Sequence, residues 1–293
     1  MAVGSRERRR AEDYAREHGL ERAHGSYDEL LADPGLDAVY ISLPNSLHVE
    51  WSVRALEADK HVLCEKPLDR RPAAVERAFD AAERAGRLLM EGFMYRHHPQ
   101  THRLAELVAG GAIGELRLVR SAFSFPLTEL GDVRMRPELD GGALMDVGCY
   151  CVSGSRLLAG EAEAVSGEAV VGSTGIDVRF AATLRFGGDV VGHFDCGVDL
   201  PRRSELVAVG SEGMLTAPDP WLVRSSGLEL DRDGEVERIP VEQANRFQLE
   251  LENLADAIRG RAEPLLGRED ALGQARTIEA LYRSAAEGKA VSL

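Results

Sequence analysis

The chain has 293 residues, of which 44% are hydrophobic and 29% charged, a balance typical of globular chains that fold into one or two domains. Its formal net charge of −14 argues against a nucleic-acid partner and against an anionic membrane surface, because both bind through basic faces. No apolar run approaches the roughly 20 residues of a membrane-spanning helix and no secretory signal opens the chain, so we expect a cytoplasmic protein.

The first 97 residues alternate between helical and strand patterns. Amphipathic segments with good helix formers predict helices at 6–18, 26–31, 47–58 and 73–85. Short apolar runs rich in β-branched residues predict buried strands at 37–42, 61–64 and 87–90. Strands separated by helices are typical of parallel βαβ units. We therefore predict a Rossmann-type parallel sheet, an α/β domain, over residues 1–97.

The pattern changes beyond residue 115. Strands that follow one another without intervening helices predict an antiparallel sheet, with segments at 116–125, 164–171, 176–186, 190–198 and 205–209. Three helices are expected, at 142–158, 246–259 and 268–286. Residues 98–293 are therefore predicted to form an α+β domain with a large, open, mainly antiparallel sheet. Alternating apolar residues in this sheet could pair with a second copy or face its own helices: Val178, Phe180, Ala182 and Leu184.

Lys66 directly follows a predicted strand and precedes Pro67, which keeps it extended. The carboxyl ends of parallel strands face the ligand crevice in doubly wound folds, so Lys66 is aimed at whatever binds there. An ammonium partly removed from water can have a lowered pKa and serve in proton transfer. The alternative is a lysine that only ends a strand.

A second cluster lies in the predicted helix that begins near Gly142. Asp146 and Tyr150 are four residues apart, which places both on one helical face. A phenol beside a cation has a lowered pKa and can exchange a proton with a substrate hydroxyl. The alternative is a tyrosine stacked in the domain interface. His98 and His102 also share a face, but no carboxylate or cysteine joins them at ligand spacing, so we predict no metal site.

Four motifs occur in an order that matches a known family: Leu43–His48, Glu65–Pro67, Glu91–Arg96 and Gly141–Tyr150. With them, the sequence resembles the Gfo/Idh/MocA oxidoreductases, in particular the branch of glucose–fructose oxidoreductase, xylose dehydrogenase and dihydrodiol dehydrogenase. That branch has tyrosine where many relatives have histidine, and Tyr150 follows it. The resemblance covers essentially the whole chain.

The resemblance implies hydride transfer between NADP(H) and the CH–OH or C=O group of a sugar, polyol or vicinal diol. Tyr150 would be the general acid/base, Lys66 would lower its pKa and polarise the substrate oxygen, and Asp146 would orient both. The dinucleotide would be lined by Leu43, Pro44, Asn45, His48, Glu65, Lys66 and Arg96. The substrate would meet Lys66, Phe125, Arg134, Asp146 and Tyr150. Since relatives assemble through the second-domain sheet, a homodimer or homotetramer is also expected.

Ser5 and Arg6 match the end of the second Rossmann strand, where a cofactor's ribose is recognised. A hydroxyl and a guanidinium fit a 2′-phosphate, which favours NADP, with NAD still possible. The alternative is a solvated basic helix face, because Arg8, Arg9 and Arg10 follow closely.

The Gly-rich turn that opens such domains is not found in residues 1–36, where glycine occurs at positions 4, 19, 25 and 35. We therefore expect the first βα unit to be missing, the second strand to be separated from the fourth, and NADPH binding by these 293 residues to be poor. The missing unit has three possible explanations. Further residues precede the given start, or the truncation is real and another segment or subunit fills the gap, or the chain is a decayed relative that no longer binds the dinucleotide. A non-catalytic sugar- or dinucleotide-binding regulator is the alternative function, and a relative that eliminates glycosides through transient NAD oxidation is a third.

Overall fold

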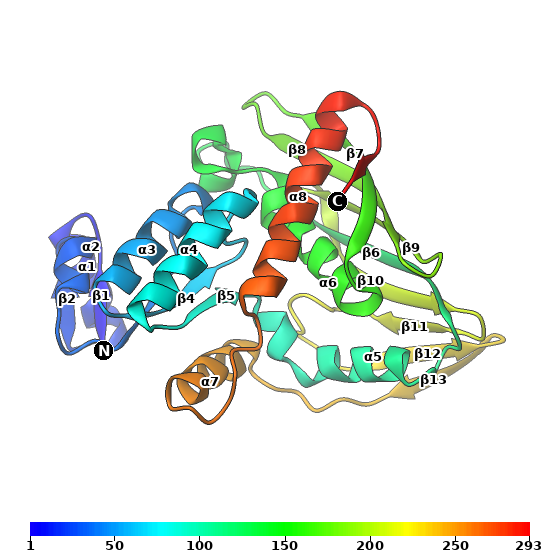
Figure 1. Ribbon diagram of the computed structural model, residues 1–293, viewed down its shortest axis with the longest axis horizontal. Helices are drawn as coiled ribbons and strands as arrows, with labels where there is room; N and C mark the ends of the chain where they lie inside the picture. Colours follow the sequence, from blue (N-terminus) through cyan, green and yellow to red (C-terminus); the bar gives the residue numbers. More distant parts are fainter.

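The computed structural model describes all 293 residues as two domains joined along one side (Figure 1). The first domain contains five short strands, β1 (Ala2–Gly4), β2 (Arg22–His24), β3 (Ala38–Ile41), β4 (His61–Glu65) and β5 (Leu89–Gly92). Its helices are α1 (Arg8–His18), α2 (Tyr27–Leu31), α3 (His48–Glu57) and α4 (Pro72–Ala85). The predicted alternation of helices and strands is confirmed.

Local signals in the sequence set the ends of these helices. The Ser26 side chain accepts a hydrogen bond from the Glu29 backbone N–H, which caps α2. Pro72 occupies the first turn of α4, where a missing N–H costs nothing. Gly86 ends α4 with φ 60°, a left-handed conformation that glycine adopts without strain.

All strand pairs of the first domain are parallel, but they form two sheets. β1 pairs only with β2, whereas β3, β4 and β5 form a sheet in that order. The two sheets do not pair with each other, which is the separation that the sequence predicted. Figure 1 places β1, β2, α1 and α2 at the outer end of the domain.

The second domain is built on a nine-stranded sheet in the order β13-β12-β11-β10-β6-β9-β8-β7-β14. All neighbours are antiparallel except β6 and β9. The strands are β6 (Leu116–Pro126), β7 (Ala162–Val171), β8 (Asp177–Phe186), β9 (Val191–Gly197), β10 (Asp199–Gly210), β11 (Met214–Ala217), β12 (Leu228–Arg232), β13 (Glu235–Ile239) and β14 (Val291–Ser292). The predicted fold class, a parallel Rossmann-type domain followed by a mainly antiparallel sheet domain, is confirmed.

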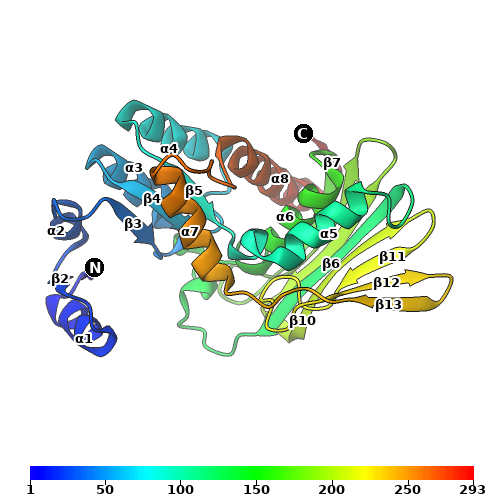
Figure 2. The ribbon, with the colours of Figure 1, turned by 90° about the horizontal axis from the view of Figure 1, so that it is seen from below.

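Helices α5 (Pro99–Ala109), α6 (Cys149–Ala159) and α8 (Arg268–Glu287) lie on the same side of this sheet (Figure 2). They cover the alternating apolar face, so the four β8 side chains considered for pairing with a second copy belong instead to the domain's own core: Val178, Phe180, Ala182 and Leu184. The opposite face of β8 is exposed. Helix α8 also contributes Ala271, Leu272 and Ala275 to the core of the first domain, so it packs against both domains.

Several elements differ from the sequence prediction. Helix α5 and strands β11 to β14 were not predicted, because they are short or lack alternation; β13, for example, is almost entirely exposed. The predicted helix at 142–158 is not regular, since Leu144–Gly148 forms a π-helical turn before α6. Helix α7 (Arg246–Ile258) follows prediction. No helix is both long and apolar enough to cross a membrane.

Candidate active site

A cavity of about 670 Å³ opens where the carboxyl ends of β3 and β4 face the second domain. Parallel strands in α/β folds present their ligands at this edge. The first domain contributes the loop after β3 and the end of β4, and the second contributes the π-turn, β6 and the start of α7. The lining includes these residues selected from the sequence: Leu43, Pro44, Asn45, His48, Glu65, Lys66, Phe125, Arg134, Asp146 and Tyr150.

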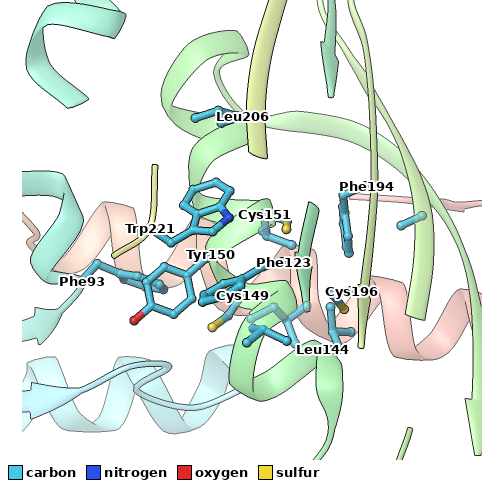
Figure 3. Close-up of a cluster of buried hydrophobic side chains, with 14 of the residues drawn as sticks. Phe93, Phe123, Leu144, Cys149, Tyr150, Cys151, Phe194, Cys196, Leu206 and Trp221 are labelled. Atoms are coloured by element: carbon cyan, nitrogen blue, oxygen red, sulfur yellow. The ribbon is translucent and has the colours of Figure 1, made fainter. Parts of the chain in front are cut away.

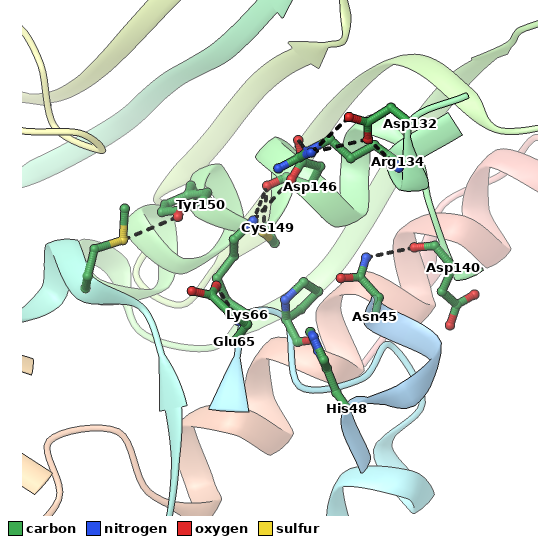
Figure 4. A network of polar contacts seen from close by, with 12 residues as sticks. Asn45, His48, Glu65, Lys66, Asp132, Arg134, Asp140, Asp146, Cys149 and Tyr150 are labelled. Atoms are coloured by element: carbon green, nitrogen blue, oxygen red, sulfur yellow. Dashed lines mark hydrogen bonds and ion pairs between the residues drawn. The ribbon is translucent and has the colours of Figure 1, made fainter. Parts of the chain in front are cut away.

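Lys66 joins the two domains across this cavity (Figure 4). Its Nζ donates to the main-chain oxygen of Asp146 at 2.7 Å and lies 3.3 Å from the Asp146 Oδ1 atom. The ammonium also lies 4.9 Å from the ring centre of Tyr150. The Lys66–Pro67 peptide bond is cis. The lysine, the aspartate and the tyrosine therefore meet at one point.

The Asp146 carboxylate holds two cations. Its Oδ1 faces Lys66, and its Oδ2 accepts from the Arg134 Nε at 3.0 Å. Arg134 also pairs with Asp132 at 3.2 Å, so its charge is already compensated. The carboxylate thus orients one side chain from each domain.

Asp177 fixes the π-turn that carries Asp146. Its Oδ2 accepts the backbone N–H of Leu144 at 2.7 Å, at the start of the turn. Gly142 lies against the same carboxylate with φ 126°, and a Cβ there would stand 2.2 Å from the Asp177 Oδ1. Glycine is required for this close approach. Burial raises the pKa of Asp177 to about 6.

Tyr150 is buried in a cluster of aromatic rings (Figure 3). Phe93, Phe123 and Trp221 surround it with ring centres 5.3 to 6.0 Å away. Its hydroxyl donates to the Met94 sulfur at 3.4 Å. The sulfur is a weak acceptor, so the hydroxyl is only weakly held in this arrangement.

The pKa values of Tyr150 and Lys66 shift in the direction opposite to the one expected from the sequence, since both are raised. Burial raises the pKa of Tyr150 well above its ordinary value, and the nearby charge of Lys66 only reduces that rise. Burial disfavours the charge of Lys66, but the surrounding acidic groups, Asp146 and Glu65 among them, raise its pKa overall. Spacing in the sequence identified Lys66 and Tyr150 as neighbours, but it did not show that both are removed from water. For the phenol, this loss of water decides the direction of the pKa shift.

The loop after β3 is tied down by side chains predicted to line the dinucleotide. The His48 ring lies between two carbonyl oxygens, 2.7 Å from Leu43 and 2.9 Å from Pro67. Burial lowers the pKa of His48. Asn45 donates to the Asp140 carbonyl at 2.8 Å and so connects the loop to the second domain.

Three residues selected as cofactor ligands do not line the cavity. Ser5 and Arg6 follow β1 at the outer end of the first domain. Arg96 turns toward a buried polar cluster, where its guanidinium lies 3.3 Å from Asp270 and 3.4 Å from Ser153.

His98, which the sequence placed on one helical face with His102, hydrogen bonds with the backbone N–H groups of Gln100 and Ala244.

Other cavity residues were not selected from the sequence: Met94, Phe123, Arg202, Leu222 and Phe247. Phe247 lies in the first turn of α7, a helix that the sequence predicted without assigning it a role in the site. Arg202 gave no signal because it is one of two adjacent arginines in a strand. These residues come from β6, β10, α7, the turn after β5 and the loop between β11 and β12, and their convergence depends on the tertiary fold.

Comparisons with known proteins cover both domains. Residues 1–93 match the family model described as "Oxidoreductase family, NAD-binding Rossmann fold", and residues 101–216 match "GFO/IDH/MocA C-terminal domain". D-xylose 1-dehydrogenase (NADP(+)) 2 of Haloferax volcanii is 39% identical over 100% of this chain and 91% of its own length. A dTDP-3,4-didehydro-2,6-dideoxy-alpha-D-glucose 3-reductase of Actinomadura kijaniata is 32% identical over 97% of this chain and 87% of the relative.

Solved structures agree with these relationships. The aldose-aldose oxidoreductase of Caulobacter crescentus, complexed with glycerol, superposes with a TM-score of 0.92 at 27% identity, over 100% of this chain and 91% of that one. A 3-ketoreductase from Actinomadura kijaniata, in complex with NADP and TDP-benzene, gives a TM-score of 0.91 at 31% identity, over 97% of this chain and 89% of that one.

Proposed function

Because this chain belongs to the Gfo/Idh/MocA family of NAD(P)-binding oxidoreductases, which act on sugars or diols, we propose that it transfers a hydride between NADP(H) and the CH–OH or C=O group of a sugar, polyol or vicinal diol. The observation that carries the proposal is the meeting of Lys66, Asp146 and Tyr150 in one cavity at the carboxyl ends of β3 and β4.

The residues around the cavity fit a nicotinamide. Leu43 and Pro44 offer apolar surface, while Asn45, Glu65 and Lys66 offer polar groups at the strand ends. When bound, the nicotinamide supplies the hydride chemistry, and the protein supplies position and charge. We assign this part of the lining to the cofactor, and Phe125, Arg134 and Tyr150 to the substrate.

The end of β1 supports NADP over NAD. Arg6 is exposed and has no carboxylate partner, so its guanidinium is free for a 2′-phosphate, with the Ser5 hydroxyl beside it. The NADP in the names of the Haloferax dehydrogenase and the Actinomadura ketoreductase complex agrees with this choice. Arg96 stays a weaker prediction because its guanidinium is paired with Asp270.

Tyr150 is the proposed proton carrier. Because its pKa lies above the ordinary value, the phenol is protonated at neutral pH, and it can donate this proton to the oxygen of a carbonyl substrate as negative charge develops there. Lys66 stabilises negative charge that develops on the phenol and on the substrate oxygen. Asp146 keeps Lys66 in place through its carboxylate and its main-chain oxygen. In the oxidative direction Tyr150 must first lose its proton to solvent, and the phenolate then accepts the proton of the substrate hydroxyl.

The test is a dehydrogenase assay on the 293-residue chain and two variants. NADP⁺ reduction is followed with D-xylose, other pentoses and hexoses, and vicinal diols, and NAD⁺ is compared. Tyr150→Phe should lower kcat about 100-fold or more, the typical contribution of a general acid/base, while NADPH affinity is kept. Tyr95→Phe is the matched control, because this phenol belongs to the same aromatic cluster but bonds to Ser153 and does not line the cavity. Equal kcat in all three proteins would refute the proposed role of Tyr150.

Two further assignments stay predictions. We place the boundary between the domains at residues 97 and 98, and we expect a homodimer or homotetramer through the exposed face of the nine-stranded sheet. That face is polar and carries ion pairs such as Arg120–Glu205 and Arg179–Asp199. Light scattering that gives a monomer at micromolar concentration would contradict the assembly.

A further inference from the structure

An irregularity in the large sheet lies beside the cavity. Strand β10 advances four residues from Asp199 to Arg203 while its partner β6 advances only two, from Pro126 to Ser124. The extra residues of β10 form a bulge. Bulges bend a strand locally and change the direction of its side chains, and they recur beside active sites.

A buried serine holds the bulge. Ser124 is 0% exposed, and its hydroxyl donates to the Pro201 carbonyl at 2.6 Å and accepts from the Arg203 Nε at 3.1 Å. Both sides of the bulge are thus bonded to one atom of the neighbouring strand. The bulge is consequently a defined part of the fold.

The bulge separates two adjacent arginines. Arg203 pairs with Asp195 on the neighbouring strand β9. Arg202 instead lines the cavity, as do Phe125 and Leu222. It forms no hydrogen bond and no ion pair within the chain. Successive side chains of a strand point to opposite faces, which separates the two arginines, and Arg202 lies within the bulge.

Arg202 is the uncompensated cation of the cavity wall. Lys66 and Arg134 also line it, but both are bound to Asp146. A second unpaired guanidinium adjoins the wall: Arg246 stacks at 4.7 Å over Phe247, which lines the cavity. The Arg246 Nε is buried without a hydrogen-bond partner. A buried donor with no acceptor is costly, so a ligand that supplies one is favoured.

We propose that Arg202, assisted by Arg246, binds an anionic group on the substrate, a phosphate ester or a carboxylate, at the second-domain side of the cavity. Guanidinium groups bind these oxyanions through paired, charge-assisted hydrogen bonds. Phe125, Leu222 and Phe247 line the same cavity and offer apolar surface to the sugar that carries the charge. The inference rests on the proposed function, since it narrows the substrate from sugars in general to sugars that carry a negative charge.

The test uses three probes with the same ring: D-glucose, D-glucose 6-phosphate and D-glucuronate. Because weak cofactor binding is expected of these 293 residues, NADP⁺ is added at concentrations that saturate the protein. Calorimetry measures binding, and kcat/KM is measured for each probe that reacts. At least one charged probe should be preferred to glucose by about tenfold or more, as expected for a charge-assisted hydrogen bond. The charged probe that is preferred distinguishes a phosphate site from a carboxylate site.

Arg202→Gln should remove that preference, through KM rather than kcat. Arg185→Gln is the matched control, because Arg185 is an exposed, unpaired arginine on β8 of the same sheet and outside the cavity lining. Thermal unfolding verifies that both variants fold. A preference for glucose in the parent chain, or a preference for charge that survives Arg202→Gln, would overturn the inference.

The two proposals fail in different ways. Turnover of neutral sugars without any gain from charge would leave the oxidoreductase function standing and reject the anion site. Binding of a charged probe that depends on Arg202, with no turnover of any probe or of D-xylose, would support the anion site and reject the function.

Discussion

Glu250 on α7 is a buried carboxyl that weakens the folded state at neutral and alkaline pH. It is only 3% exposed, and its Oε1 has no hydrogen-bond partner. Burial, together with the charge of Glu65 in the cavity lining, raises its pKa to about 8. We therefore expect Glu250→Gln, which keeps the shape and removes the charge, to change how stability depends on pH.

The sign and size of this effect follow from the two pKa values. The unfolded chain ionises Glu250 at about 4.5 and the folded chain at about 8, so the folded state binds more protons between these values. The free energy of unfolding therefore falls as pH rises through this window. At 1.36 kcal/mol per pKa unit, Glu250→Gln should gain about 2–3 kcal/mol over the parent chain between pH 6 and pH 9.

Urea unfolding followed by tryptophan fluorescence at pH 6, 7.5 and 9 measures the difference, with both proteins in the same buffers. Comparing the change with pH, rather than one absolute value, cancels any constant cost of burying the glutamine amide. Glu252→Gln is the control, because this exposed side chain hydrogen bonds only with Gln248. A difference between parent and variant that stays constant from pH 6 to pH 9 would refute the reasoning.

Three other changes test the site. Asp177→Ala leaves the buried N–H of Leu144 without an acceptor, so the free energy of unfolding should fall by about 1–3 kcal/mol. Urea titrations measure this loss, and an unchanged unfolding midpoint would contradict it. Gly141→Ala would place a Cβ 2.2 Å from the Arg134 carbonyl oxygen, so the loop that contains both residues must move. KM for the sugar should then rise severalfold in steady-state assays. An unaltered KM would mean that this loop does not shape the substrate side of the cavity. Lys66→Met removes the ammonium but keeps the length, and kcat should fall at least 100-fold in single-turnover measurements, whereas a loss below tenfold would exclude a central role.

The fold was largely predictable because its strongest signals are local. Apolar runs that end in motif residues marked β3 and β4, and alternation marked β6 and β8. The same strands deliver Lys66 to the cavity, since the position of a residue at the carboxyl end of a parallel strand is fixed by topology. The strands β11 and β12 also bury alternate side chains, but they are only four and five residues long, and β13 is almost entirely exposed, so none of the three gave a clear signal.

The missing parts of the site depend on contacts between distant segments. The bulge that contains Arg202 is bonded to Ser124 on another strand, and the aromatic cluster around Tyr150 draws Phe93 and Trp221 from different elements. Sequence spacing placed Tyr150 beside Lys66, yet it could not reveal that the phenol is dehydrated on nearly all sides, and so gave the wrong sign for its pKa shift.

The π-turn at Leu144–Gly148 holds one more residue per turn than an α-helix would. The wide turn absorbs that residue, so the side chains of α6 keep nearly the faces they would have after a regular helical turn. Deleting one residue within Leu144–Gly148 would restore regular pitch and displace Asp146, which lies inside the turn, while Tyr150 would keep its orientation. Such a deletion is therefore expected to break the contact of Asp146 with Lys66 without unfolding the helix.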